Sequence, residues 1–426
     1  MDSAERRIVT FTAGSHALVH TYELSIPILL TVWIAEFSTT AAVLGIIVTV
    51  GYGLFGVGAL PGGILVDRYG SKPLILTCLA GMAGSFILVS LAPNLLTLAI
   101  AIAVWGVTAS VYHPAGLSLI SKSIDKRGTA LGYHGIGGNL GIALGPLATA
   151  LLLLAFDWRV VAAALTIPAV AVAAYGVTVD VDTALSDTDG SASADGTEGS
   201  ASADGDDTRR DISLASIADD TRLLLASGFL LVFIFVTFSG LYYRTFLTFL
   251  PDLLGNIFDG LIDIQLIDPD SPYADEFDIA QYLYVAILMV GVFGQYLGGR
   301  IADSIPPERG LILLMSVLAV LALLFVPASA TTATFVAVSL LLGVALFTIQ
   351  PITQSTVAAY SPSKARGISF GYVYLGIFGV GSLGAALAGI ILTRAGPREL
   401  FFVLAGTAAL GALTAVAITR FAVRQN

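Results

Sequence analysis

The sequence predicts an all-α protein that crosses a lipid bilayer twelve times, in two six-helix halves that repeat each other. Of its 426 residues, 56% are apolar and only 12% are charged, and the mean hydropathy is +0.88. Soluble domains carry about 25% charged residues, so this composition excludes an ordinary soluble enzyme. Apolar runs of about 20 residues recur along the chain. They are long enough to span a bilayer as helices and too long and uniform for barrel strands.

Apolar runs separated by polar breaks give the twelve predicted spans. They cover residues 8–35, 41–66, 72–92, 95–120, 128–155, 158–179, 223–251, 279–302, 309–328, 331–358, 367–393 and 398–420. With both chain ends in the cytoplasm, sixteen of the 20 Lys and Arg residues fall on the cytoplasmic side, as the positive-inside rule requires. We therefore expect a multi-pass protein of the cell (plasma) membrane with cytoplasmic N- and C-termini.

Two acidic segments interrupt the spans. Residues 180–220 are rich in Asp, Ser, Gly and Ala, which is typical of a flexible, solvated linker, and residues 252–278 form a second acidic segment. The net charge of −10 and the lack of a basic face exclude nucleic-acid binding as the main function. The predicted division is an N-terminal six-helix bundle at 1–179, an acidic cytoplasmic linker at 180–222, and a C-terminal six-helix bundle at 223–426.

The two halves share motifs at a nearly constant offset. The segment Gly62-Gly63-Ile64-Leu65-Val66-Asp67 matches Gly298-Gly299-Arg300-Ile301-Ala302-Asp303, Arg127-Gly128 matches Arg366-Gly367, and His113-Pro114 matches Gln350-Pro351. Matching elements in the same order indicate parallel repeats related by an axis along the membrane normal. A substrate is then expected to bind between the halves near the membrane midplane.

The loop after the second span carries a family motif. Residues 63–72 read Gly-Ile-Leu-Val-Asp-Arg-Tyr-Gly-Ser-Lys, which resembles the G-x-L-x-D-R-x-G-x-K signature of the major facilitator superfamily. The resemblance implies twelve helices, alternating access, and a gate in which the motif's Asp and Arg pair with neighbouring helix ends on the cytoplasmic side. The gate residues carried over are Gly63, Asp67, Arg68, Gly70 and Lys72, with Gly299, Arg300 and Asp303 in the second copy.

A narrower resemblance concerns the first, fourth and fifth spans. The stretches His16-Ala-Leu-Val-His20-Thr-Tyr22, Tyr112-His113-Pro114 and Gly137-Gly138-Asn139-Leu140-Gly141 are similar to the fosmidomycin-resistance branch of efflux carriers. Gly141, Gly145 and Pro146 also resemble the antiporter motif of drug exporters. Glycines four residues apart allow two helices to approach closely, and close packing alone would also explain them.

Charged residues within a membrane are costly and are therefore functional candidates. On the first span, His16, His20 and Glu23 are spaced to share one helix face. Histidine titrates near physiological pH, and a carboxylate removed from water holds a proton more readily. We predict that these three residues couple transport to protons, although a buried histidine can also serve only as a helix–helix hydrogen-bonding group.

Arg244 is the basic residue predicted within a span. The repeat places it at the same depth as His20 on the opposite wall, which suggests an anionic ligand because guanidinium binds carboxylate or phosphate bidentately. The alternative is an internal Arg244–Glu23 ion pair that closes the empty site. The predicted substrate-binding residues are His20, Tyr112, His113, Tyr243, Arg244, Gln350 and Gln354.

The sequence contains no P-loop, metal-ligand cluster or nucleophile–base motif, so we expect no enzyme activity and no metal or cofactor. We predict a secondary transporter, working as a monomer in the lipid bilayer, that exports a small organic compound by proton-coupled efflux, as in drug resistance, with an organic anion as one candidate substrate. An importer or exchanger of organic anions is the alternative. A membrane sensor that does not transport is a lesser one.

Overall fold

The computed structural model describes residues 1–124, 126–181, 221, 222, 224, 228–258, 279–361 and 366–425, and these residues form helices joined by short turns. The first half contains α1 (Ser3–Glu36), α2 (Ala41–Val57), α3 (Ala59–Tyr69), α4 (Ser71–Ser90), α5 (Leu95–Ala109), α6 (Tyr112–Ser123), α7 (Arg127–Leu153), α8 (Trp158–Ala164) and α9 (Thr166–Thr178). The second half contains α12 (Phe229–Leu247), α13 (Leu250–Phe258), α14 (Ile279–Ser304), α15 (Pro307–Ala328), α16 (Thr332–Tyr360), α17 (Arg366–Tyr374), η2 (Leu375–Gly379), η3 (Val380–Ser382), α18 (Leu383–Arg394) and α19 (Pro397–Gln425).

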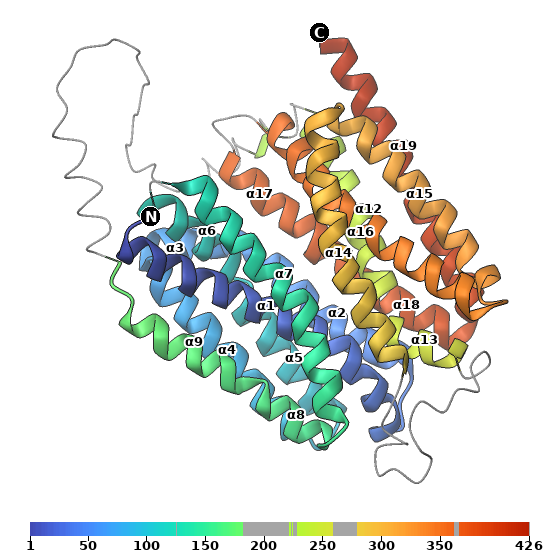
Figure 1. The fold of residues 1–426 in the computed structure, drawn as a ribbon, viewed down its shortest axis with the longest axis horizontal. Helices are drawn as coiled ribbons and strands as arrows, with labels where there is room; N and C mark the ends of the chain where they lie inside the picture. Colours follow the sequence, from blue (N-terminus) through green and yellow to red (C-terminus); the bar gives the residue numbers. More distant parts are fainter. Residues whose placement is uncertain are drawn as a thin grey trace.

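Twelve of the described helical segments are long and apolar enough to cross a membrane, which confirms the predicted number of spans. Polar side chains cap the N-termini of several helices. The side chains of Thr40, Asn94 and Thr331 accept hydrogen bonds from the first turns of α2, α5 and α16. Figure 1 shows the two halves side by side, with both chain ends on the same side of the bundle. We call this the terminal side and the opposite one the far side.

The structure differs from the predicted spans after the seventh. Helix α12 ends at Leu247, and after a short turn a separate helix, α13, extends to Phe258, so the predicted acidic segment 252–278 begins with helical residues. The reason is apolar burial, because Leu253 and Leu254 pack into the core with 3% and 0% exposure. The rest of that segment, and nearly all of the predicted linker at 180–222, lie outside the described residues.

The halves meet on the far side through α2 and α18. A Cβ atom at Gly45 or Gly389 would overlap the backbone of the facing helix, so glycine is what allows this approach. Thr49 fixes the contact, since its Oγ1 donates to the Ser382 carbonyl at 3.0 Å and accepts from the Ala386 amide at 2.9 Å. The eleventh span is locally a π-helix at η2, which is frequent at functional sites.

Candidate functional site

A cavity of about 460 Å³ lies between the two halves, a size that suits a small organic molecule. Its polar lining consists of His16, His20, Glu23, His113, His134, Asn139, Ser239, Tyr243, Gln295, Gln350, Thr353, Gln354 and Tyr374. Most of these residues lie near the middle of the membrane spans or nearer the terminal side. The cavity therefore lies on the terminal side of the α2–α18 contact, and the exposed residue Gln354 is part of its lining.

Glu23 lies at the inner end of the cavity and joins the two halves. The carboxylate is buried, and each of its oxygens has a partner. Oε1 accepts a hydrogen bond from Arg244 of α12 in a buried ion pair, and Oε2 lies 2.7 Å from Nδ1 of His20. The alternative interpretation of the sequence, an internal pair between Glu23 and Arg244, is what the structure has.

Arg244 lies behind Glu23. Its side chain is 2% exposed, does not line the cavity, and stacks over the Tyr52 ring at 3.8 Å. The expectation that Arg244 and His20 would face each other across the cavity is therefore wrong in this conformation. The matching offsets concern depth along the helix axis, and they do not determine the direction of the Arg244 side chain around that axis. Its Nε has no hydrogen-bond partner among the described residues.

All four histidines of the chain gather at this cavity. Nδ1 of His16 lies 2.8 Å from the backbone carbonyl of His134, and the two rings stack with centroids 4.1 Å apart. Nε2 of His16 lies 3.1 Å from Nε2 of His20. A continuous row of hydrogen-bonding groups therefore runs from the His134 carbonyl through His16 and His20 to Glu23.

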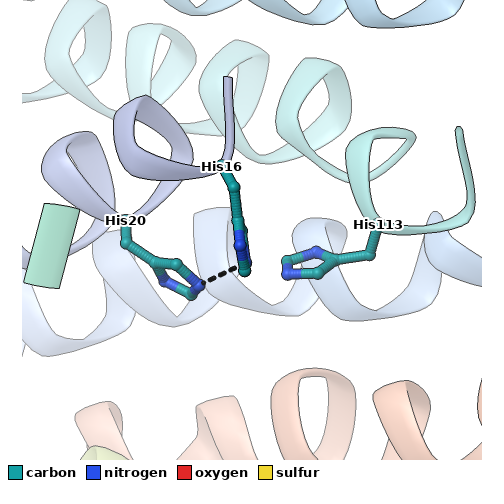
Figure 2. A group of neighbouring side chains, drawn as sticks. All are labelled: His16, His20 and His113. Atoms are coloured by element: carbon teal, nitrogen blue, oxygen red, sulfur yellow. Dashed lines mark hydrogen bonds between the residues drawn. The ribbon is translucent and has the colours of Figure 1, made fainter. Parts of the chain in front are cut away.

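His113 of α6 completes a three-histidine cluster. Figure 2 shows the imidazoles of His16 and His20, both on α1, and of His113 pointing toward one another. One ring nitrogen from each residue lies within 4.8 Å of the others. The expectation that the chain has no metal-ligand cluster is therefore not supported, since three imidazoles converge here. Sequence spacing could not reveal the cluster because His113 lies far along the chain from the other two.

The remaining predicted binding residues divide into two groups. Tyr243, Gln350 and Gln354 line the cavity, and Gln350 accepts a hydrogen bond from Gln295 at 3.2 Å. Tyr112 does not line it, because the side chain is fully buried and its hydroxyl donates to the Thr12 carbonyl. Tyr112 therefore supports the wall behind His16, where the two rings stack.

Several lining residues are not among those predicted from the sequence. Gln295, Thr353, Tyr374 and Phe378 all contribute to the wall. Gln295 had a detectable signal, because it is a polar residue inside an apolar run shortly before the second copy of the motif. Tyr374 and Phe378 had no such signal in the sequence, because aromatic side chains in a membrane helix can face lipid, protein or a cavity.

The predicted gate residues lie on the terminal side. Gly70 adopts φ +82° between α3 and α4, a conformation that favours glycine. Lys72 donates to the carbonyls of Val177 and Val179 at 3.1 and 2.6 Å, at the end of α9. Arg68 is exposed and lies over the Tyr69 ring, whereas the side chain of Asp67 lies outside what the structure describes.

The charged residues in the second copy of the motif are also exposed. Arg300 and Asp303 are both exposed, and Arg300 donates to the Tyr296 hydroxyl at 3.2 Å. A Cβ at Gly63 or at its counterpart Gly299 would meet no atom of the described residues within 4 Å. Neither glycine is therefore needed for close packing in this conformation.

The antiporter-like motif of α7 packs against α1. A Cβ at Gly141 would overlap the Ala17 backbone, and one at Gly145 would lie 2.6 Å from Cα of Thr21. Pro146 lies inside the helix. The predicted close packing is therefore present, and it holds the histidine face of α1 against the wall formed by α7.

The fold and the cavity define a polytopic membrane protein with a cavity of small-molecule size between its two halves. A family model described as Major Facilitator Superfamily matches residues 15–261 and 258–425. The chain therefore belongs to the major facilitator superfamily. The narrower resemblance to the fosmidomycin-resistance branch stays a prediction.

Curated relatives are similar over short stretches. An uncharacterised MFS-type transporter of Mycobacterium tuberculosis is 35% identical over 100 residues, 23% of this chain and 24% of that protein. A puromycin resistance protein of Streptomyces alboniger is 35% identical over 108 residues, 25% of this chain and 22% of that protein. The similarity thus spans about a quarter of each relative.

Solved structures share the fold over nearly the full length. A bacterial homologue of the human lysosomal transporter Spinster, in an inward-facing and unoccupied conformation, has a TM-score of 0.71 at 13% identity, covering 99% of this chain and 98% of that one. A nucleoside transporter has a TM-score of 0.72 at 14% identity, with 98% and 100% coverage. At such low identity these likenesses show the fold alone.

Proposed function

We propose that this protein carries a small organic anion through alternating access, coupled to protons that enter through the row of histidines ending at Glu23. The observation that carries the proposal is the position of Glu23, which hydrogen-bonds to His20 on its own helix and forms an ion pair with Arg244 of the opposite half. One carboxylate therefore contacts both the titratable groups and the buried cation.

The hydrogen bonds indicate how a proton would be stored. The row contains a Glu23–His20 contact, a His20–His16 contact and a contact from His16 to the His134 carbonyl, so each contact requires one hydrogen. Two neutral imidazoles and an ionised carboxylate supply only two hydrogens. The complete row therefore holds one additional proton, shared among Glu23, His20 and His16.

That proton and an anion would stabilise each other. When the proton moves to Glu23, the carboxylate loses its charge and its ion pair with Arg244. In the proposed cycle the neutral Glu23 side chain then turns aside and opens the Arg244 guanidinium, which suits a carboxylate or phosphate group, to the cavity. When the proton leaves, Glu23 pairs with Arg244 again and the anion loses its partner. Geometry therefore favours binding of the proton and the anion together, and hence their movement in the same direction, over the exchange predicted from the sequence.

Efflux by exchange is the second candidate. It is supported by the resemblance of Gly141, Gly145 and Pro146 to the antiporter motif and by the similarity to a puromycin resistance protein. In the proposed orientation both termini are cytoplasmic, so the cavity lies on the cytoplasmic side of the α2–α18 contact. One chain provides the whole cavity, which is why we propose that the monomer transports.

Proteoliposomes containing a lumenal pH dye distinguish the two candidates. With the membrane voltage clamped by K⁺ and valinomycin, an inward anion gradient should acidify the lumen if proton and anion move together, and should make it alkaline if they exchange. The panel contains phosphonates, carboxylates and lipophilic cations, added singly. Glu23→Gln should abolish the proton signal, whereas Glu36→Gln, in an exposed ion pair, should leave it unchanged.

The assay also has outcomes that contradict the proposal. Proton movement of normal size in Glu23→Gln would remove this carboxylate from coupling. A signal triggered by cations alone would make Glu23 the counter-charge of the substrate and Arg244 its resting partner. Arg244→Gln should weaken anion affinity, so unchanged affinity in that variant would refute the anion assignment.

A further inference from the structure

We propose that His16, His20 and His113 form a binding site for a transition-metal dication of the Zn²⁺ type at the wall of the central cavity. The proposal goes beyond the transport of an organic substrate and does not depend on it. It rests on the convergence of three imidazoles, on the partners of their second ring nitrogens, and on access through the cavity.

In His16 and His20 one ring nitrogen, Nδ1, already has an oxygen partner. The other, Nε2, is therefore available to bind a metal ion. Nδ1 of His16 faces the His134 carbonyl, and Nδ1 of His20 faces the Glu23 carboxylate. Both oxygens accept hydrogen bonds, so in the neutral imidazoles each Nδ1 carries the hydrogen and each Nε2 presents a lone pair. Metal-binding histidines use this same pairing of one nitrogen with a carbonyl or carboxylate and the other with the metal.

The two lone pairs meet at a distance close to that of a metal site. The Nε2 atoms of His16 and His20 are 3.1 Å apart. Two ligands about 2.0–2.1 Å from a tetrahedral Zn²⁺ ion are separated by about 3.4 Å, so a small outward movement of the rings makes room for the ion. Two facing lone pairs without a cation between them would repel, so this pair of nitrogens favours either a proton or a metal ion.

His113 supplies the third nitrogen. Its ring stands edge-on to that of His16, with centroids 5.3 Å apart, and Figure 2 shows it directed at the other two. The three candidate ligand atoms lie within 4.8 Å of one another, so His113 must approach by rotation of its side chain. Three protein nitrogens with a fourth position open to the cavity match a Zn²⁺ site that retains a water or an anionic ligand.

The imidazole nitrogens determine which metal ions the site would bind. Imidazole nitrogen suits Zn²⁺, Ni²⁺ and Cu²⁺, whereas Mg²⁺ and Ca²⁺ require oxygen ligands. The Glu23 carboxylate is already held by His20 and Arg244, so it acts here as the partner of a ligand. The site should therefore bind Zn²⁺ and Co²⁺ and discriminate strongly against Mg²⁺.

The test uses the full-length protein in detergent after removal of any polyhistidine tag. Calorimetric titration with Zn²⁺ should show one saturable site, and Co²⁺ should give the intense visible absorption of a four-coordinate complex. His113→Gln should lower the Zn²⁺ affinity by more than the 10–100-fold that typically follows loss of an outer partner. His134→Gln is the matched control, because this histidine lines the same cavity but is not among the three converging residues.

The control should bind Zn²⁺ as tightly as the unmodified chain. The proposal is overturned if His113→Gln binds Zn²⁺ normally, if Co²⁺ shows only the faint spectrum of six-coordinate hydrated ion, or if Mg²⁺ competes equally, since the last result would indicate binding to the acidic loops. Should His113→Gln fail to fold, as judged by size-exclusion chromatography, His20→Gln tests the same cluster. No step requires transport, so failure here is distinguishable from failure of the proposed function.

Discussion

The buried pair between Glu23 and Arg244 predicts an unequal response to the loss of its two members. Glu23→Gln leaves the guanidinium, which is effectively always charged, buried without a counter-ion. The Arg244 side chain is only 2% exposed, so this loss should cost about 3–5 kcal/mol of stability. Arg244→Gln should cost less, about 1–3 kcal/mol, because Glu23 keeps its hydrogen bond to His20 and can take up a proton.

A double-mutant cycle provides the decisive comparison. Glu23→Gln combined with Arg244→Gln removes both charges and should restore about 1–3 kcal/mol relative to Glu23→Gln alone, the coupling expected of contacting residues. Because unfolding in detergent is commonly irreversible, the variants are ranked by apparent Tm at one fixed scan rate. Equal losses in the two single variants, or a double variant no more stable than Glu23→Gln, would refute the reasoning.

An exposed ion pair of the same kind serves as the control. Arg159 and Glu36 are joined at 2.7 Å, but their side chains are 37% and 34% exposed. Exposed pairs contribute about 0–1 kcal/mol because water and salt screen them. Glu36→Gln should therefore shift the apparent Tm much less than Glu23→Gln, which separates the effect of burial from the effect of removing any carboxylate.

Two further predictions concern packing and access. Gly141→Ala should destabilise the protein by about 1–3 kcal/mol, because the added methyl group overlaps the Ala17 backbone, whereas Gly132→Ala on the same helix meets open space and should not lower the apparent Tm. After Cys78, the buried and single cysteine, is replaced by alanine, Gln354→Cys should react with an impermeant thiol reagent applied from the cytoplasmic side. Reaction from the opposite side alone would contradict the proposed orientation.

The sequence contained enough information to predict the membrane spans and the main members of the site. Lipid requires long apolar helices, so their number and approximate positions follow from hydropathy. The cost of a charge within the membrane singled out Glu23 and Arg244, and helical spacing placed His16 and His20 on the face of Glu23. Helix α13, which extends to Phe258, was not predicted because its buried Leu253 and Leu254 lie at the start of an acidic segment.

Contacts between distant parts of the chain could not be predicted in the same way. Matching offsets between the repeats fix depth along a helix, but a residue's direction around the axis depends on how the helix rotates against its neighbours. Arg244 accordingly lies behind Glu23 and not on the cavity wall. The approach of His113 and His134 to His16 likewise depends on the packing of α6 and α7 against α1, which is set partly by Gly141 and Gly145.

The position of Glu23 also explains how protonation could influence the conformation. Its carboxylate belongs to α1, its partner Arg244 belongs to α12, and the pair therefore holds the two halves together at the inner end of the cavity. Movement of a proton onto Glu23 would remove one of the two charges of the ion pair. The electrostatic energy lost would depend on whether the two halves are in contact at the inner end of the cavity. A group whose interaction differs between two conformations shifts their populations. In the proposed cycle, coupling therefore needs no long-range signal, because the residue that binds the proton is the residue that joins the halves.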